Sequence, residues 1–191
     1  HSFGGILQTY YAIKYPEKVK GIMMFNCTLN MKESLEKSYI PAVVDFFGIQ
    51  DNHYLNNKSV SLSKRLDSIQ KLFAAKEDVW KLSFNSFESA RQFGQTYAGF
   101  DKWNMDFSKA AFKINDYNKD FAQHSTSIKI PTLFLYGSDD HNVGVQHYKK
   151  AKFPNMMLVK IDAGHMAFID NNAEYINAVK AFLDKYFPEQ F

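Results

Sequence analysis

The chain has 191 residues, of which 46% are hydrophobic, so it can bury a core of its own. Its net charge of +3 comes from 23 basic and 20 acidic residues spread along the chain, without the basic cluster that binding to nucleic acid requires. The single cysteine, Cys27, excludes an internal disulfide and multi-cysteine zinc sites, and it is compatible with the cytoplasmic location that we predict. No stretch approaches the ~20 apolar residues of a membrane span.

The first predicted element is a short, largely buried helix. Apolar side chains recur at helical spacing over residues 6–15, and Pro16 ends this pattern. Residues 19–26 then form a compact apolar run of strand length, which is typical of a parallel sheet covered on both faces.

A segment of about a hundred residues, 28–127, has a different character. It is rich in Phe, Lys, Asp, Asn and Ser and contains helical patterns over residues 62–76 and 87–97. A structureless loop of this length inside a compact domain is improbable. We therefore predict that residues 28–127 form an inserted, mostly helical cap that lies over the ends of the strands.

The last part of the chain returns to strands and helices. We predict a strand over residues 130–136 that Gly137 ends, a helix over 143–153, a strand over 156–161 and a helix over 174–186. The apolar side of the last helix comprises Tyr175, Ile176, Val179, Phe182 and Leu183.

Helix and strand thus alternate outside the cap, which indicates an α/β fold. Three strands with helical crossovers make half of a doubly wound, mostly parallel sheet. We assign residues 1–27 and 128–191 to this core.

Three polar positions are candidates for catalysis. Ser2 is followed at once by a helix, as in a strand-to-helix turn that holds a hydroxyl out of the backbone. Asp139-Asp140 follows one hydrophobic strand, and Gly164-His165 follows the last strand. A serine hydroxyl needs a base within reach and a carboxylate that orients this base. The order of these residues along the chain is therefore that of a nucleophile, an acid and a histidine.

Simpler explanations exist for each residue alone. A serine beside glycines can belong to an ordinary turn, and either aspartate could cap a helix that begins near Val143. The combination of three such turns, each at a strand end or helix start, favours catalysis. The remaining histidines, at positions 1, 53, 124, 141 and 147, are expected to lie at the surface or to serve packing.

These motifs resemble those of the α/β-hydrolase superfamily. The segment His1-Ser2-Phe3-Gly4-Gly5 is similar to its G-x-S-x-G turn, entered one residue late. The resemblance implies a serine hydrolase with the triad Ser2, Asp140 and His165, since in this family the acid commonly falls three positions after the glycine that ends the strand. It also implies that the backbone N–H of Phe3 belongs to the oxyanion hole, and that His1 packs beside the nucleophile.

The resemblance further implies a segment before His1. This segment would complete the sheet and supply the second donor of the oxyanion hole. Without it, residues 19–26 would form an unpaired apolar edge, which invites aggregation. We expect the native protein to contain it.

No cofactor or metal is predicted, because the sequence has no cysteine pair, no H-E-x-x-H and no G-x-G-x-x-G. The cap is rich in aromatic residues, most of which we expect in its core, with a few lining an apolar pocket. They are Phe46, Phe47, Trp80, Phe84, Phe87, Tyr97, Phe100, Trp103, Phe107 and Phe112. A small, hydrophobic ester or amide is the expected substrate.

Two other functions remain open. The chain also resembles proline iminopeptidases, whose caps use acidic residues to hold the free amine of the substrate. Candidates for this role are Glu33, Glu36, Glu77, Asp78 and Glu88. A non-catalytic module that binds a small ligand through the same fold is the alternative of a different class.

Overall fold

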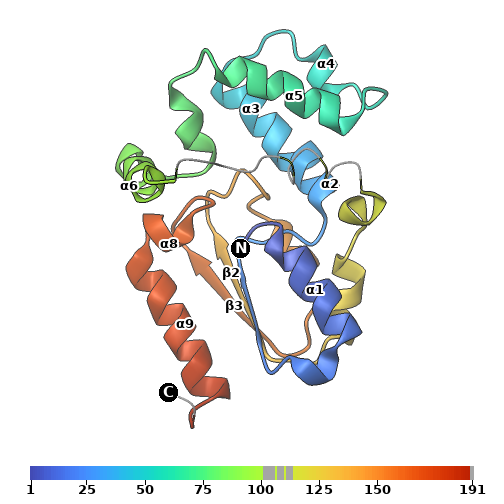
Figure 1. Ribbon diagram of the computed structural model, residues 1–191, viewed down its shortest axis with the longest axis vertical. Coiled ribbons are helices and arrows are strands. Elements are labelled where there is room, and N and C mark those ends of the chain that lie inside the picture. Colours follow the sequence, from blue (N-terminus) through green and yellow to red (C-terminus); the bar gives the residue numbers. More distant parts are fainter. Residues whose placement is uncertain (101–105, 107–109, 111–113, 190–191) are drawn as a thin grey trace.

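A parallel sheet runs through the computed structural model, which describes residues 1–100, 106, 110 and 114–189 (Figure 1). Within these residues the sheet has three strands in the order β1-β2-β3. They are β1 (Ile22–Phe25), β2 (Thr132–Gly137) and β3 (Met156–Ile161). The expected second and third strands are confirmed, whereas the first is shorter than residues 19–26.

The side chains of the sheet alternate between two cores. Met24 and Phe134 are buried with the residues of α1 (Gly4–Lys14), whereas Leu135 is buried with those of α9 (Asn172–Tyr186). Figure 1 shows these two helices on opposite sides of the strands. The predicted α/β class with a doubly wound sheet is therefore confirmed.

Several helices begin at a polar residue that caps them. Asn30, Ser61, Ser86 and Asn171 each accept a hydrogen bond from the backbone N–H three residues later. The described α-helices between β1 and β2 are α2 (Met31–Ser34), α3 (Ile40–Phe46), α4 (His53–Asn56), α5 (Leu62–Phe73) and α6 (Phe87–Tyr97), and α8 (Ala167–Asp170) precedes α9. Figure 1 shows α3, α4 and α5 beyond the end of the sheet at which the strands finish.

Shorter helical turns connect these elements. A π-helical turn, Leu35–Tyr39, joins α2 to α3. The 3₁₀ helices span Pro16–Lys18, Asp78–Leu82, Asn115–Asn118, Ala122–Ser127 and His147–Lys150. No helix in the described part of the chain is both long and apolar enough to cross a bilayer.

The helix expected over residues 143–153 is absent, and this prediction was wrong. Only the 3₁₀ helix at His147–Lys150 forms there. Gly144 has a φ of 101°, which a right-handed helix cannot include, and the side chain of Asp140 accepts from the N–H groups of Asn142 and Val143. The sequence pattern therefore belongs to a tight loop after β2.

The buried face of α9 also differs from the expected one. Ala178 and Phe182 are its buried residues, whereas Ile176 is 40% exposed. The small side chain of Ala178 lets α9 lie against the sheet, beside Leu135.

The buried cluster within residues 28–127, the segment expected to form the cap, is aliphatic rather than aromatic. Its buried residues are Ile40, Val43, Leu55, Ile69 and Leu82. Contrary to expectation, Phe46, Phe87 and Phe100 are exposed, and the other aromatic residues of the set within the described part are only partly buried. Trp103, Phe107 and Phe112 lie outside the described residues.

Candidate active site

Ser2 occupies a sharp turn between the edge of the sheet and α1. Its φ is 53°, a region that non-glycine residues rarely adopt and that costs about 1–3 kcal/mol where it occurs. The Ser2 N–H donates to the carbonyl oxygens of Phe25 and Asn26 at 3.2 and 3.1 Å, and a bridge pairs Ser2 with Cys27. This turn thus ties Ser2 to the end of β1.

Helix α1 can approach this turn because of a glycine. A Cβ atom on Gly5 would lie 2.6 Å from the Cβ atom of Cys27, whereas one on Gly4 would have no neighbour within 4 Å. The two adjacent glycines therefore have different roles, and only Gly5 is required for the close packing of α1 on the end of β1.

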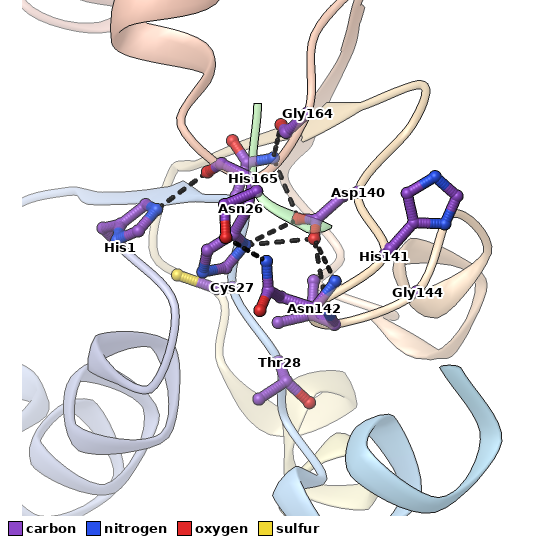
Figure 2. Close-up of polar contacts among 12 residues, drawn as sticks. His1, Asn26, Cys27, Thr28, Asp140, His141, Asn142, Gly144, Gly164 and His165 are labelled. Carbon is purple, nitrogen blue, oxygen red and sulfur yellow. Dashed lines mark hydrogen bonds and ion pairs between the residues drawn. The ribbon is translucent and has the colours of Figure 1, made fainter. Parts of the chain in front are cut away.

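Asp140 and His165 form a buried pair at the ends of β2 and β3 (Figure 2). Nδ1 of His165 lies 3.0 Å from both carboxylate oxygens of Asp140, and their side chains are 7% and 0% exposed. Because a carboxylate can only accept, Nδ1 carries the donated proton, and Nε2 of a neutral His165 keeps its lone pair. This arrangement is the one that a general base requires.

The carboxylate of Asp140 has further donors. The N–H groups of Asn142 and Val143 each lie 3.1 Å from Oδ1, and Nδ2 of Asn26 lies 3.0 Å from Oδ2. Burial raises the pKa of Asp140, but the charge of His165 and the hydrogen bonds from His165 and Asn26 outweigh burial and lower this pKa below its ordinary value. Asp140 is therefore ionised at neutral pH.

Asp139, the neighbouring acid, points elsewhere. Its carboxylate accepts from the hydroxyl of Ser138 at 2.9 Å, and its N–H donates to the carbonyl oxygen of Ala163 at 3.0 Å. The structure thus brings Asp140, and not Asp139, to His165.

His1 brings the serine segment next to the histidine segment. Its Nε2 lies 2.9 Å from the carbonyl oxygen of His165, and the two imidazole rings have centroids 4.6 Å apart (Figure 2). No hydrogen bond between these described segments joins the Ser2 hydroxyl to His165. Hydrogen bonds between catalytic groups are often long until substrate binds. Asp140 and His165 are therefore paired, and His1, the neighbour of Ser2, contacts His165.

Phe3 lies directly between Ser2 and the first turn of α1. Its backbone is helical, and its ring packs on Tyr117 with centroids 4.5 Å apart. This position suits the expected oxyanion donor.

Asn26 and Asn142 are residues of the site that sequence reasoning missed. Both donate to Asp140, Asn26 from its side chain and Asn142 from its backbone. The one sequence signal for Asn26 is a polar residue at the end of an apolar strand.

Leu82 and Ser83, in the segment expected to form the cap, contact both loops of the pair. Nδ2 of Asn142 donates to the carbonyl oxygen of Leu82 and to the hydroxyl of Ser83 at 2.8 and 2.9 Å. The carbonyl oxygen of Ser83 accepts from the N–H of Met166 at 3.1 Å. One cap segment therefore bridges the loop of the acid and the loop of the histidine.

A cavity of about 290 Å³ lies between α2 and the loop after β2. Its wall includes Thr28, Leu29, Ser34, Val143 and Gly144. Its charged lining residues are Glu33, Lys37 and Lys150, and the carboxylate of Glu33 forms ion pairs with both lysines. Hydrogen bonds from Lys150 and Lys37 lower the pKa of Glu33. Among the described residues, no group of three His, Cys, Asp or Glu side chains is placed to hold a metal ion.

The chain belongs to the alpha/beta hydrolase fold family, whose pattern it matches over residues 1–172. It is 35% identical to Protein ABHD14A of Mus musculus over 71 residues, which are 36% of this chain and 29% of the mouse protein.

Solved structures share the fold at lower identity. An alpha/beta fold family hydrolase from Bacillus anthracis str. Sterne aligns with a TM-score of 0.66 and 18% identity, covering 96% of this chain and 65% of that one. A proline iminopeptidase-related protein from Thermus thermophilus aligns with a TM-score of 0.72 and 16% identity, covering 98% and 63%. The enol-lactonase from Burkholderia xenovorans LB400 aligns with a TM-score of 0.62 and 15% identity, covering 95% of this chain and 63% of that one. The chain thus spans less than two thirds of the length of each of these relatives.

Proposed function

We propose that the protein is a serine hydrolase that cleaves an ester or amide bond of a small substrate through an acyl-enzyme. The observation that supports this most strongly is the buried, hydrogen-bonded pair of Asp140 and His165, held beside a serine in a strained strand-to-helix turn. Burying an aspartate and a histidine costs free energy, so a buried pair of this kind is expected where the pair has a function.

In the proposed reaction, Ser2 attacks the carbonyl carbon while Nε2 of His165 takes the hydroxyl proton. Asp140 stabilises the imidazolium that results, because its carboxylate is already ionised and hydrogen-bonded to Nδ1. His165 then protonates the leaving group. Water, deprotonated by His165, releases the acyl group and regenerates Ser2.

The oxyanion that forms on the carbonyl requires donors. We assign one donor to the backbone N–H of Phe3.

The acidic residues of segment 28–127 favour an ester or amide substrate that has no free amine over the substrate of an aminopeptidase. Most of the acidic residues considered for amine binding already form ion pairs. These pairs are Glu33 with Lys37 and Lys150, Glu36 with Arg65, Asp78 with Lys81, and Glu88 with Arg91. An incoming ammonium group would have to displace a lysine or arginine.

Initial rates of the full-length protein on short p-nitrophenyl esters and on proline β-naphthylamide test this proposal. We expect turnover of the esters and its loss in Ser2→Ala. Preferential turnover of the naphthylamide would favour the aminopeptidase. Equal turnover by the wild type and Ser2→Ala would contradict the role of Ser2, and no turnover above the uncatalysed rate would favour the non-catalytic binding module.

A further inference from the structure

Asn26 contacts all three segments that carry the proposed triad. It lies at the end of β1, is fully buried, and has a φ of 48°. We propose that Asn26 is a positioning residue that fixes the serine, acid and histidine segments relative to one another. This inference rests on the proposed function and deepens it.

The contacts use both the backbone and the side chain. The carbonyl oxygen of Asn26 accepts from the N–H of Ser2 at 3.1 Å. Its Nδ2 donates to Oδ2 of Asp140 and to the carbonyl oxygen of Gly164, both at 3.0 Å (Figure 2). Gly164 directly precedes His165, so one amide connects the ends of β1, β2 and β3.

The orientation of this amide is fixed by its partners. Both acceptors of Nδ2, the Asp140 carboxylate and the Gly164 carbonyl oxygen, have no hydrogen to donate. If the amide were flipped, Oδ1 would lie against these two oxygens and accept no hydrogen bond from them. Asparagine also tolerates a positive φ better than most residues. Gly137 leaves room for the side chain, since a Cβ there would lie 3.0 Å from Nδ2.

The oxygen atom of the Asn26 amide, Oδ1, indicates why a polar residue occupies this position. Oδ1 of Asn26 is buried and has no hydrogen-bond partner among the described residues. An unpaired buried acceptor is destabilising, and an apolar side chain of similar size would avoid this cost. The amide is therefore retained for its donors, which an apolar residue could not supply.

The donors act on the charge of Asp140. Removing them favours the protonated carboxyl and raises the pKa of Asp140. The ionisable groups that act on this carboxylate are His165 and His147. Because loss of the amide raises the pKa of Asp140, we expect the acid limb of the kcat/KM profile to move to higher pH.

Two variants of the full-length protein test the proposal. Asn26→Gly keeps the positive φ and removes the amide, and Asn26→Asp keeps the shape and replaces the donors with acceptors. The matched control is Asn155→Asp, because Asn155 also donates through Nδ2, to the carbonyl oxygen of Lys129, but is exposed.

With p-nitrophenyl esters, we expect kcat per titrated active site to fall about 10- to 100-fold in both Asn26 variants, the range for losing a hydrogen bond to a charged group. KM should change little, and the acid limb should move to higher pH. Asn155→Asp should match the wild type. A purely structural role would lower the melting temperature and leave kcat per active site and the acid limb unchanged, which would overturn the proposal.

A second measurement does not depend on turnover. The carboxyl carbon of Asp140, followed by ¹³C NMR and assigned with Asp140→Asn, should titrate at higher pH in Asn26→Gly than in the wild type. An unchanged titration would contradict the positioning role, even if the protein proved catalytically inactive. Ester turnover at the wild-type rate in the Asn26 variants would overturn this inference and leave the proposed function intact. Loss of the fold in both variants would show that Asn26 is structural and would also overturn it.

Discussion

Backbone strain among individual residues is concentrated at the candidate site. Ser2 and Asn26 are the two non-glycine residues with positive φ in the described part of the chain, and they are hydrogen-bonded to each other. Strained residues persist where the surrounding structure holds them in place, and they often occur at functional sites. The strained backbone here places Ser2 in the turn before α1 and the side-chain amide of Asn26 against the carboxylate of Asp140.

The two adjacent aspartates should differ sharply in their effect on rate. Asp140→Asn removes the charge that orients His165, and comparable changes of a triad acid lower kcat by about 10⁴-fold. Asp139→Asn should lower kcat little, because Asp139 contacts Ser138 instead. Steady-state kinetics of the two variants on one ester check this. Equal losses would show that the pair seen in the structure is not the catalytic one.

His147 should make the folding stability depend on pH. Burial lowers its pKa in the folded protein, whereas the unfolded value is about 6.5. The unfolded chain therefore binds more protons between these two values, so the stability is full above about pH 6.5 and is lost as the pH falls toward the folded pKa. We expect the urea midpoint to fall between about pH 7 and pH 5.

His147→Gln should reduce this dependence, because glutamine can donate to the carbonyl oxygen of Gly144, as Nδ1 of His147 does, without titrating. His53→Gln, at an exposed position, serves as the control and should retain it. An identical pH dependence in His147→Gln and the wild type would assign the effect to other groups.

At the scale of elements, the packing of α1 on the end of β1 depends on one glycine. Gly5→Ala would place a methyl group against Cys27 and should destabilise the protein by about 1–3 kcal/mol, the usual cost of overpacking. Gly4→Ala has open space and should stabilise it by up to about 1 kcal/mol, because alanine favours the helix. Urea denaturation of both variants measures the difference. Similar effects of the two changes would contradict the close approach.

Sequence periodicity predicts some elements of the fold closely and misses others. The strand 156–161 and the helix 87–97 were predicted with the bounds that the structure has. The helix over 143–153 failed because the side chain of Asp140 takes two backbone N–H groups and Gly144 turns left-handed. The loop is thus set by hydrogen bonds from a side chain to the backbone two and three residues later, which the periodicity of apolar residues does not reveal.

The same limit applies to the site. Ser2, Asp140 and His165 are recognisable because each stands in a distinctive turn at a strand or helix end. Asn26 has only one local sign, a polar residue at the end of an apolar strand, and its role appears only when the ends of three strands meet.

At the scale of the whole molecule, residues 28–127, the segment expected to form the cap, are tied to the rest of the chain by polar contacts and contain a buried ion pair. Arg65, with a side chain 4% exposed, pairs with Glu36 and so joins α5 to the π-helical turn before α3. Ser83 and Asn142 link the cap to the loops of the candidate site. The cap is thereby positioned to influence how Asp140 and His165 are held.

Loss of the buried ion pair should destabilise the cap. Glu36→Gln leaves Arg65 buried without an anionic partner and should lower the free energy of unfolding by about 1.5–3 kcal/mol, the range for a hydrogen bond to a charged group. Glu88→Gln breaks an exposed pair with Arg91 and should have little effect. Urea denaturation compares them, and equal stability of Glu36→Gln and the wild type would show that the pair contributes nothing.

The central claim is that Ser2 is a nucleophile activated by His165 and Asp140. Its most direct test is the reaction of the folded, full-length protein with a fluorophosphonate, followed by peptide mass spectrometry. We predict one adduct per chain on the peptide that contains Ser2, which is absent in Ser2→Ala and forms far more slowly in Asp140→Asn. A folded protein that remains unlabelled, or that is labelled at another residue, would contradict the claim.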